Sequence, residues 1–364
     1  MNSNNKILIA AGGTGGHIFP AYSLMRHFKE KKFDVKIITD KRGYRFLKYY
    51  QDADLKIVLS GTIIKKKPFK SIFSLIKMTI CFFNVLVHML LNRPKLVFGM
   101  GGYLSFPICL AAKVLRIPFI IYESNLLIGK ANKYLLPFAK KMFVSYSELE
   151  GVDLKYKSKI IQIGNIIRKE ILNYNHKNYT NNENKLNILI LGGSQAAKIF
   201  AEILPSIFVT CSKNGINLEI YQQCLPGQNK KLEQLYNLNK IKFELFNFSN
   251  DILKIFEKIN LVITRSGASI TGELLNCKIP FISIPLRTSA DEHQFKNAKY
   301  FEEKGYNFLI EEKDINTKLF TLIKSIHEDK SLIKKIVEKQ KKHSDKLVFE
   351  KIDQKIKEIF YAKN

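Results

Sequence analysis

Residues 6–21 read KILIAAGGTGGHIFPA, which is an apolar run, a glycine-rich turn and then a helical pattern. A continuous apolar run that ends in glycine is typical of a strand buried in a parallel sheet. Glycines between a strand and a helix let backbone N–H groups approach an anion, and the start of the helix adds partial positive charge. The segment therefore predicts a strand–turn–helix unit that can bind an anion.

Two common phosphate-binding motifs are excluded at this turn. The dinucleotide fingerprint needs a third glycine where this chain has Ile18, and a Walker loop needs Gly-Lys-Ser or Gly-Lys-Thr. An NAD-dependent oxidoreductase is therefore disfavoured. His17 is the informative residue, because an imidazole beside an anion-binding backbone can take a proton from a bound hydroxyl near neutral pH. The other interpretation of His17 is a histidine that only caps or packs at the start of the helix.

The strand pattern recurs along the chain. Short β-branched runs lie at residues 35–39, 56–59, 96–98, 118–122, 141–144, 159–163, 218–222, 241–246, 261–264 and 280–284. Residues 187–194 read NILILGGS and repeat the strand–Gly-Gly–hydroxyl opening of residues 6–14. Strands that alternate with helices indicate parallel sheets covered on both faces. Two such openings about 180 residues apart predict two similar α/β domains in tandem, and residues 331–360 follow a helical period.

Composition restricts the class of protein. The chain has 364 residues, 46% of them hydrophobic, which excludes wholesale disorder. Its formal net charge is +27, which indicates either a compositional bias or a polyanionic partner such as a membrane or a nucleic acid. Five scattered cysteines without a CxxC pair argue against disulfides and zinc and for a reducing compartment.

One apolar segment is a candidate for contact with a membrane. Residues 71–91 read SIFSLIKMTICFFNVLVHMLL, and the uncharged run after Lys77 is shorter than the roughly 20 residues of a spanning helix. We expect a helix with one face in the core and the other at an interface. The lysines before it are mixed with phenylalanine, and this mixture favours binding to an anionic bilayer surface. The residues expected to dock there are Lys65, Lys66, Lys67, Phe69, Lys70 and Phe73.

Seven ordered motifs carry a family resemblance. They are GGTGGHIFPA (12–21), GGYLSFP (101–107), ESN (123–125), GNIIR (164–168), GGSQ (192–195), RSGA with the glutamate of the next helix (265–273), and DEHQ with the following NA (291–298). In this order they resemble the MurG family of N-acetylglucosaminyltransferases, which completes the lipid-linked precursor of peptidoglycan. The resemblance extends over most of the chain.

The resemblance implies the α/β GT-B glycosyltransferase fold, in which two Rossmann-like parallel-sheet domains face a cleft. Residues 1–164 would form an acceptor-binding, membrane-facing domain, and residues 165–344 a domain that binds UDP-N-acetylglucosamine (UDP-GlcNAc). A final helix at about residues 345–364 would pack back on the first domain.

The implied reaction is an inverting displacement. It moves N-acetylglucosamine to the 4-hydroxyl of the N-acetylmuramoyl sugar of lipid I (undecaprenyl-diphosphate-MurNAc-pentapeptide) and forms lipid II. The implied location is peripheral, at the cytoplasmic face of the bacterial inner membrane.

The resemblance also implies roles for residues of this chain. His17 would be the catalytic base. The residues implied for the acceptor are Gly13, Thr14, Gly15, Gly16, Gly101, Gly102, Tyr103 and Asn125. Those implied for the donor are Arg168, Ser194, Ser266, Gly267, Ala268, Glu273, His293 and Gln294, together with Thr14, Gly15, Gly16 and Asn125.

Some of these positions have a second interpretation. Asn125 can be a turn residue, Glu273 a solvated helix residue, and Arg265, beside the motifs, a structural ion pair. The chain departs from the family pattern at Tyr122, where histidine is common, and at His293, where some members have glutamine.

No catalytic metal or other cofactor is expected. Residues 52–54 read DAD, the metal signature of another glycosyltransferase fold, but they precede a strand instead of ending one and predict a surface turn. Arginine and helix-terminus charge can stabilise the leaving group instead.

The rival functions are a transferase acting on diacylglycerol and a UDP-sugar epimerase. A nucleic-acid-binding module would explain the charge but not the glycine turns, so no nucleic-acid partner is expected.

Overall fold

The computed structural model describes residues 5–61, 68–174, 185–249 and 251–361. Contacts divide the chain into two compact units. The first, called here the first domain, comprises residues 1–169 and 345–364, and the second domain comprises residues 170–344. The two domains are described separately.

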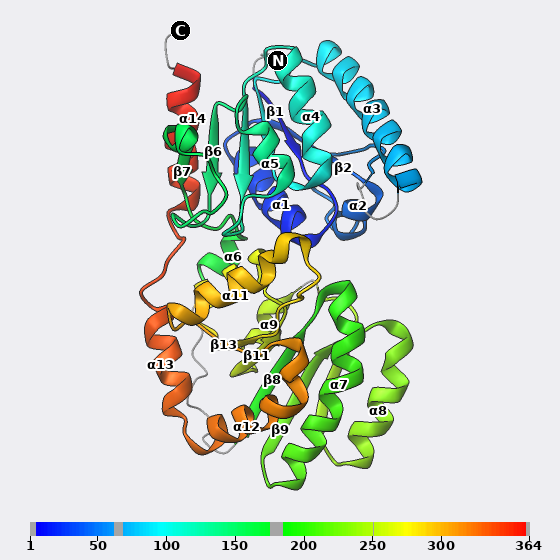
Figure 1. Ribbon diagram of the computed structural model, residues 1–364, viewed down its shortest axis with the longest axis vertical. Coiled ribbons are helices and arrows are strands. Elements are labelled where there is room, and N and C mark those ends of the chain that lie inside the picture. Colours follow the sequence, from blue (N-terminus) through cyan, green and yellow to red (C-terminus); the bar gives the residue numbers. More distant parts are fainter. Residues whose placement is uncertain (1–4, 62–67, 175–184, 250, 362–364) are drawn as a thin grey trace. The chain divides into compact units, whose positions relative to one another are not determined.

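The first domain contains a parallel sheet of seven strands in the order β3-β2-β1-β4-β5-β6-β7 (Figure 1). The strands are β1 (Lys6–Ala10), β2 (Asp34–Thr39), β3 (Leu55–Ile57), β4 (Leu96–Gly99), β5 (Phe119–Glu123), β6 (Lys141–Val144) and β7 (Ile160–Gln162). The helices are α1 (Gly15–Glu30), α2 (Lys41–Leu47), α3 (Pro68–Leu91), α4 (Gly102–Val114), α5 (Lys130–Leu135) and α14 (Val348–Tyr361). Every residue of β4 and β5 is buried, because helices cover both faces of the sheet.

Helix α3 has one buried face and one exposed face. Cys81, Val85 and Met89 recur at helical spacing and join the core cluster of the first sheet. The helix lies beside α4, as Figure 1 shows. Its other face carries large apolar side chains that remain exposed.

Helix α14 belongs to the first domain although it ends the described chain. Nε2 of His27 in α1 lies 2.7 Å from Oδ1 of Asp353 in α14, and the His27 ring stacks on Phe349 at 4.6 Å. Nδ2 of Asn165 donates to Oδ2 of Asp345 at 2.9 Å. These contacts fasten the returning chain to the first domain.

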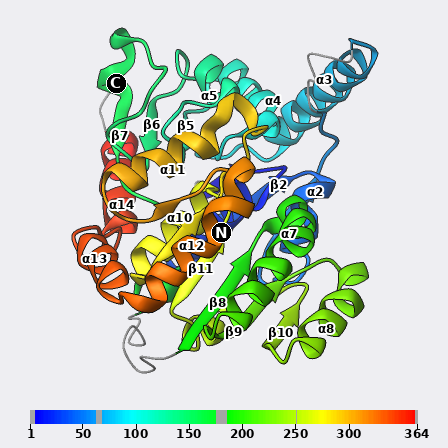
Figure 2. The same ribbon diagram turned by 60° about the horizontal axis from the view of Figure 1, so that its bottom comes forward.

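The second domain contains a parallel sheet of six strands in the order β10-β9-β8-β11-β12-β13. They are β8 (Lys185–Leu191), β9 (Asn217–Gln223), β10 (Lys242–Phe246), β11 (Leu261–Thr264), β12 (Phe281–Ser283) and β13 (Phe308–Leu309). Figure 2 shows β8, β9 and β10 side by side, with α7 (Gly193–Lys213) next to α8 (Asn229–Leu238). The other α-helices are α9 (Ile252–Phe256), α10 (Ala268–Cys277), α11 (His293–Glu303), α12 (Ile315–Glu328) and α13 (Ser331–Gln340), while α6 (Lys169–Leu172) joins the two domains.

Each run predicted as a strand forms a strand whose ends lie within two residues of the prediction. The two-residue strand β13 was not predicted. The helical period of residues 331–360 is interrupted, because α13 ends at Gln340 and α14 begins at Val348.

Candidate active site

Each sheet has a topological switch point, where the chain continues from two neighbouring strands toward opposite edges of the sheet. It lies between β1 and β4 in the first sheet and between β8 and β11 in the second. Ligands of open parallel sheets bind beyond the carboxyl ends of the strands at such a point. The turns after these four strands, residues 11–14, 100–101, 192 and 265–267, belong to the motifs identified in the sequence.

His17 lies at the first switch point, against the turn that follows β4. A Cβ atom added to Gly101 would lie 3.0 Å from Cε1 of His17, and one added to Gly102 would lie 3.2 Å from Cδ2. Both glycines have positive φ angles, +88° and +74°, which other residues rarely adopt. The fold thus brings together two motifs that are 84 positions apart in the sequence, counted from His17 to Gly101.

The first glycine turn leads directly into α1. Thr14 precedes the helix and is exposed, while Gly15 and Gly16 form its first turn. The first N–H groups of a helix have no intrahelical partner, and together with the helix dipole they favour an anion. Gly13 differs, because its N–H already donates to Oδ1 of Asp40 at 3.1 Å.

Asp40 was not predicted as a site residue. It follows β2, and its Oδ1 also accepts the N–H of Gly43 at 2.8 Å. Its Oδ2 accepts the hydroxyl of Ser60 at 2.6 Å and two N–H groups of Arg42. Burial alone would raise the pKa of Asp40, but these hydrogen bonds and that from Gly13 outweigh it and hold the pKa below its ordinary value. An ionised carboxylate therefore fixes the glycine turn.

Glu123, at the end of β5, positions Asn125. Its Oε1 accepts the backbone and side-chain N–H groups of Asn125 at 3.1 and 2.9 Å. Its Oε2 accepts the N–H of Gly129 at 2.8 Å and Nδ2 of Asn132 at 2.9 Å. Asn132 also lies beside the Gly101 turn, since its Nδ2 is 3.7 Å from the position of a Cβ atom on Gly101. The sequence indicated Asn125 but not the carboxylate that orients it.

Tyr122 supports the segment that leads to Arg168. Its hydroxyl lies 2.8 Å from the hydroxyl of Ser145 and accepts the N–H of Ile166 at 3.0 Å. Arg168 follows this segment, between β7 and α6, and is half-buried. The departure from histidine at Tyr122 therefore preserves a buried hydrogen-bonding side chain.

In the second domain, the turn after β8 is held from the neighbouring strand. The N–H of Gly192 donates to Oε1 of Gln223, the last residue of β9, at 3.3 Å. Ser194 falls in the first turn of α7, and its side chain lies outside the described residues.

The turn after β11 contains Ser266, which is fully buried. Its carbonyl accepts Nδ2 of Asn297 at 3.3 Å, so the fold joins two of the sequence motifs. Its hydroxyl has no hydrogen-bond partner among the residues that the structure describes. Gly267 precedes α10, and Ala268 begins it. Glu273 on the same helix is buried, in contrast to the solvated residue considered from the sequence.

The segment before α11 is strained. Asp291 and Glu292 both adopt left-handed conformations, with φ of 52° and 55°. Such conformations cost of order 1–3 kcal/mol each and cluster at functional sites. They place His293 at the start of α11 and Gln294 next to it, where Oε1 of Gln294 accepts the N–H of Leu286 at 3.0 Å.

Arg265 has a structural role. Its Nη1 donates to the carbonyl of Ile284 at 3.0 Å, and its Nη2 lies 2.5 Å from Oε2 of Glu312. Arg287 similarly binds Glu311, at 2.8 Å. Arg265 therefore forms the ion pair considered as its second interpretation.

Residues 52–54 form the predicted exposed turn, and protein groups bind both carboxylates. Asp52 accepts the hydroxyl of Tyr22 at 2.8 Å, and Asp54 lies 3.4 Å from the amine of Lys36. Among the described residues, no three His, Cys, Asp or Glu side chains gather as a metal site would require. All five cysteines are buried and unpaired.

Comparison with known proteins gives matches to both domains. Residues 7–144 match the glycosyltransferase family 28 N-terminal domain, and residues 187–356 match the glycosyltransferase family 28 C-terminal domain. A relative from Pelagibacter ubique (strain HTCC1062) is 36% identical over 320 residues, which covers 86% of this chain and 87% of the relative. That relative is named UDP-N-acetylglucosamine--N-acetylmuramyl-(pentapeptide) pyrophosphoryl-undecaprenol N-acetylglucosamine transferase.

Two solved structures share the fold. The crystal structure of Acinetobacter baumannii MurG has a TM-score of 0.76 at 23% identity and covers 97% of this chain and 99% of that one. A putative UDP-N-acetylglucosamine 2-epimerase from Listeria monocytogenes has a TM-score of 0.65 at 18% identity, covering 99% and 98%.

Two Rossmann-like parallel-sheet domains, which match both domains of one glycosyltransferase family, define a glycosyltransferase of the GT-B class. The epimerase likeness extends to the fold alone. The chain belongs to glycosyltransferase family 28, and within it to the MurG family of its Pelagibacter relative.

Proposed function

We infer that this chain transfers N-acetylglucosamine from UDP-GlcNAc to the 4-hydroxyl of the N-acetylmuramoyl sugar of lipid I, forming lipid II. The observation that carries the inference is the 36% identity to a relative named for that transfer, over 86% of this chain. The presence of an anion-compatible turn at both switch points supports it.

The first domain holds the acceptor. The acceptor-binding residues are Gly13, Thr14, Gly15, Gly16, Gly101, Gly102, Tyr103 and Asn125. The two glycine turns meet at His17, which supports a single binding site there. Asn125, oriented by Glu123, then contacts the reacting sugar.

His17 acts as the general base. It accepts the proton of the acceptor 4-hydroxyl while that oxygen attacks C1 of N-acetylglucosamine. The bond from C1 to the β-phosphate oxygen breaks at the same time, and UDP leaves with the electron pair. Attack from the face opposite UDP inverts the anomeric centre and gives a β1,4 linkage. The imidazole lies against two glycines. Because these residues have no side chains, they do not crowd the base, which supports this role.

The second domain provides most of the donor site. The residues there are Ser194, Ser266, Gly267, Ala268, Glu273, His293 and Gln294. The resemblance also implies donor contacts for Arg168, Thr14, Gly15, Gly16 and Asn125. The diphosphate lies at the turn before α10, where backbone N–H groups and the helix dipole favour it. Glu273 binds the ribose hydroxyls, and its burial on α10 supports a role inside a site.

The exposed face of α3 docks on the anionic surface of a bilayer, because lipid I carries its polyprenyl chain in the membrane. The large apolar side chains exposed on this face are Ile72, Phe73, Leu75, Ile76, Ile80, Phe83, Val87, Leu90 and Leu91. Residues 72–91 are long and apolar enough to cross a membrane, with a mean hydropathy of 1.8. The opposite face of α3 packs in the core, which favours a helix that lies on the bilayer surface. We place the protein peripherally, at the cytoplasmic face of the bacterial inner membrane.

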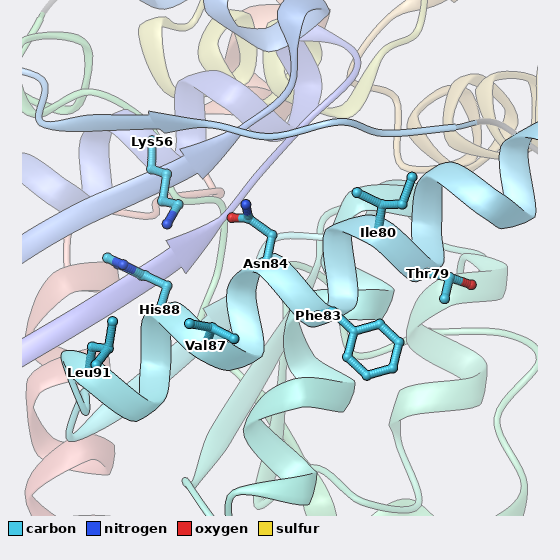
Figure 3. Close-up of a pocket in the computed structure, with 8 residues that line it drawn as sticks. All are labelled: Lys56, Thr79, Ile80, Phe83, Asn84, Val87, His88 and Leu91. Atoms are coloured by element: carbon cyan, nitrogen blue, oxygen red, sulfur yellow. The ribbon is translucent and has the colours of Figure 1, made fainter.

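Lys56 lines a groove along α3 and adds positive charge to this surface. Figure 3 shows Lys56 of β3 reaching toward Asn84 and His88, with Phe83 and Val87 along the same helix. Lys56 and Lys36 are close enough to His88 to lower its pKa further, after burial, which is the main cause. Cations beside exposed apolar side chains are the combination that binds anionic lipid. Lys65, Lys66 and Lys67 lie outside the described residues, as do the side chains of Phe69 and Lys70.

The test is incubation with labelled UDP-GlcNAc and a short-chain lipid I analogue, followed by determination of the product's linkage. We expect a β1,4-linked disaccharide on the lipid. Equal incorporation from UDP-glucose would contradict the donor assignment. Conversion of UDP-GlcNAc to its 2-epimer without acceptor would identify an epimerase instead.

A further inference from the structure

Arg42 lies beside the first glycine turn but belongs to none of the sequence motifs. Its Nη2 is 3.8 Å, and its Cζ 4.0 Å, from the position of a Cβ atom on Gly13. Gly13 has a φ of +87°, so the turn brings bare backbone next to the guanidinium. The chain has only eight arginines among its 59 basic residues, yet one of them is at this position.

Asp40 holds the guanidinium and the turn together. Its Oδ2 accepts Nε of Arg42 at 3.1 Å and Nη2 at 2.9 Å, while its Oδ1 accepts the N–H of Gly13. The side chain of Asp40 is 5% exposed, but that of Arg42 is 48% exposed. The guanidinium of Arg42 is therefore partly exposed to solvent, whereas the carboxylate of Asp40 is buried.

The bonds to Asp40 leave part of the guanidinium available. They use Nε and one hydrogen of Nη2, and Nη1 has no hydrogen-bond partner among the described residues. A guanidinium presents several donors in one plane, which suits the oxygens of a phosphate better than an ammonium group does. A surface ion pair alone would contribute little to stability.

We propose that Arg42 is a substrate-binding residue that contacts the acceptor diphosphate, with Asp40 as the positioning residue that aims it. This inference rests on the proposed function, since it assigns the acceptor to the first glycine turn. In the complex, Nη1 and the remaining Nη2 hydrogen donate to phosphate oxygens, while the N–H groups at the start of α1 approach the same group.

The test compares Arg42→Gln and Arg42→Lys with Arg45→Gln. Arg45 lies on the same short helix and is exposed, so its substitution is a control for net charge and for α2. Arg42→Gln should raise the KM for a lipid I analogue about tenfold or more, because hydrogen bonds to charged groups are lost. The KM for UDP-GlcNAc and the thermal midpoint should stay near wild type. The KM of Arg42→Lys for the lipid I analogue should lie between those of the wild type and Arg42→Gln, since lysine keeps the charge but lacks the planar donors.

A second readout does not require turnover. Inorganic pyrophosphate is titrated calorimetrically into each protein in the presence of saturating UDP, which occupies the donor site. Arg42→Gln should weaken this binding about tenfold relative to Arg45→Gln. Equal acceptor KM and equal pyrophosphate affinity in the two glutamine variants would overturn the proposal. If the wild type makes no lipid II, the proposed function fails, and the pyrophosphate result still decides whether Arg42 binds a diphosphate.

Discussion

His17 is the side chain at which two glycine turns meet, so its removal tests the chemistry most directly. His17→Ala is expected to lower kcat about 10²–10⁴-fold, the usual effect of losing a general base. The affinity for UDP should change little, because the substitution removes no predicted contact of the nucleotide. Steady-state kinetics with a soluble acceptor and calorimetric UDP binding measure both quantities.

His327→Ala is the control, because this histidine lies on α12 of the second domain and belongs to no predicted site. Its kcat should remain near wild type. A folded His17→Ala protein with near-normal turnover would leave His17 as a residue that only packs against Gly101 and Gly102.

Glu273 tests the donor site. Glu273→Ala should weaken UDP binding by about 1.5–3 kcal/mol, the range for hydrogen bonds to a charged group. Glu303→Ala removes an exposed carboxylate from α11 and should leave UDP affinity unchanged. The hypothesis fails if both variants bind UDP like the wild type in a calorimetric titration.

Sequence reasoning could single out side chains that belong to glycine motifs but not the side chains that hydrogen-bond to those motifs. His17 could be proposed from the sequence because it directly follows a glycine turn. The contact of Asp40 with Gly13 could not be predicted, because the two residues are 27 positions apart and only the pairing of β1 with β2 brings them together. The orienting role of Glu123 depends likewise on hydrogen bonds that its own motif does not reveal.

At the level of elements, α3 makes the clearest prediction. Phe73 and Phe83 are 65% and 58% exposed on the face proposed to dock. The double substitution Phe73→Ser/Phe83→Ser should release the protein from vesicles that contain anionic lipid, since each buried phenylalanine contributes about 1.5–3 kcal/mol. Turnover of a soluble acceptor should barely change.

Leu238→Ser provides the matched control, because Leu238 is an exposed apolar residue at the end of α8, in the second domain. It should leave vesicle binding unchanged in a flotation assay. Unaltered binding of the double variant would remove α3 from the membrane surface.

Short apolar, β-branched runs predicted the strands well, because most of the strands are buried on both faces and therefore apolar along their length. The strand β13 was not predicted, since two residues are too short to stand out as an apolar run, and only pairing with β12 defines it. The periodicity did not show the division between α13 and α14, whereas the resemblance implied a separate final helix at about residues 345–364. Residues 338–346 contain no apolar side chain that could mark a period, and there the chain returns to the first domain, where Asp345 binds Asn165.

At the level of the whole molecule, His27 makes the attachment of α14 to the first domain dependent on pH. Burial lowers the pKa of His27 below its ordinary value near 6.5, although the hydrogen bond to Asp353 opposes this. The unfolded state therefore binds the proton more readily, and stability is lost as pH falls below about 6.5 toward the lower folded pKa. The slope from one such group is at most about 1.4 kcal/mol per pH unit.

Hydrogen exchange measures this effect locally. Protection of α14 amides, corrected for intrinsic exchange, should fall between pH 7 and pH 5.5, and His27→Gln should reduce that fall. Protection of α13, in the second domain, serves as the internal reference. An equal loss of protection in α14 of wild type and variant would show that another group controls it.

The leaving group gives a second prediction at this scale. Turnover should persist in EDTA, because helix-terminus charge and arginine can stabilise the departing diphosphate without a metal. Complete loss of turnover that Mg²⁺ or Mn²⁺ restores would contradict this expectation.

The path of the chain makes the second domain a continuous insertion in the first. The chain leaves the first domain after residue 169 and returns at Asp345, which binds Asn165 near the point of departure. Residues 170–344 therefore form one continuous segment of the sequence. The seven strands of the first sheet and α14 lie outside this segment, and a truncation after residue 169 would remove Phe349, whose ring stacks on His27 of α1. Under the proposed function, exchanging this single gene segment between relatives would move seven of the proposed donor residues together.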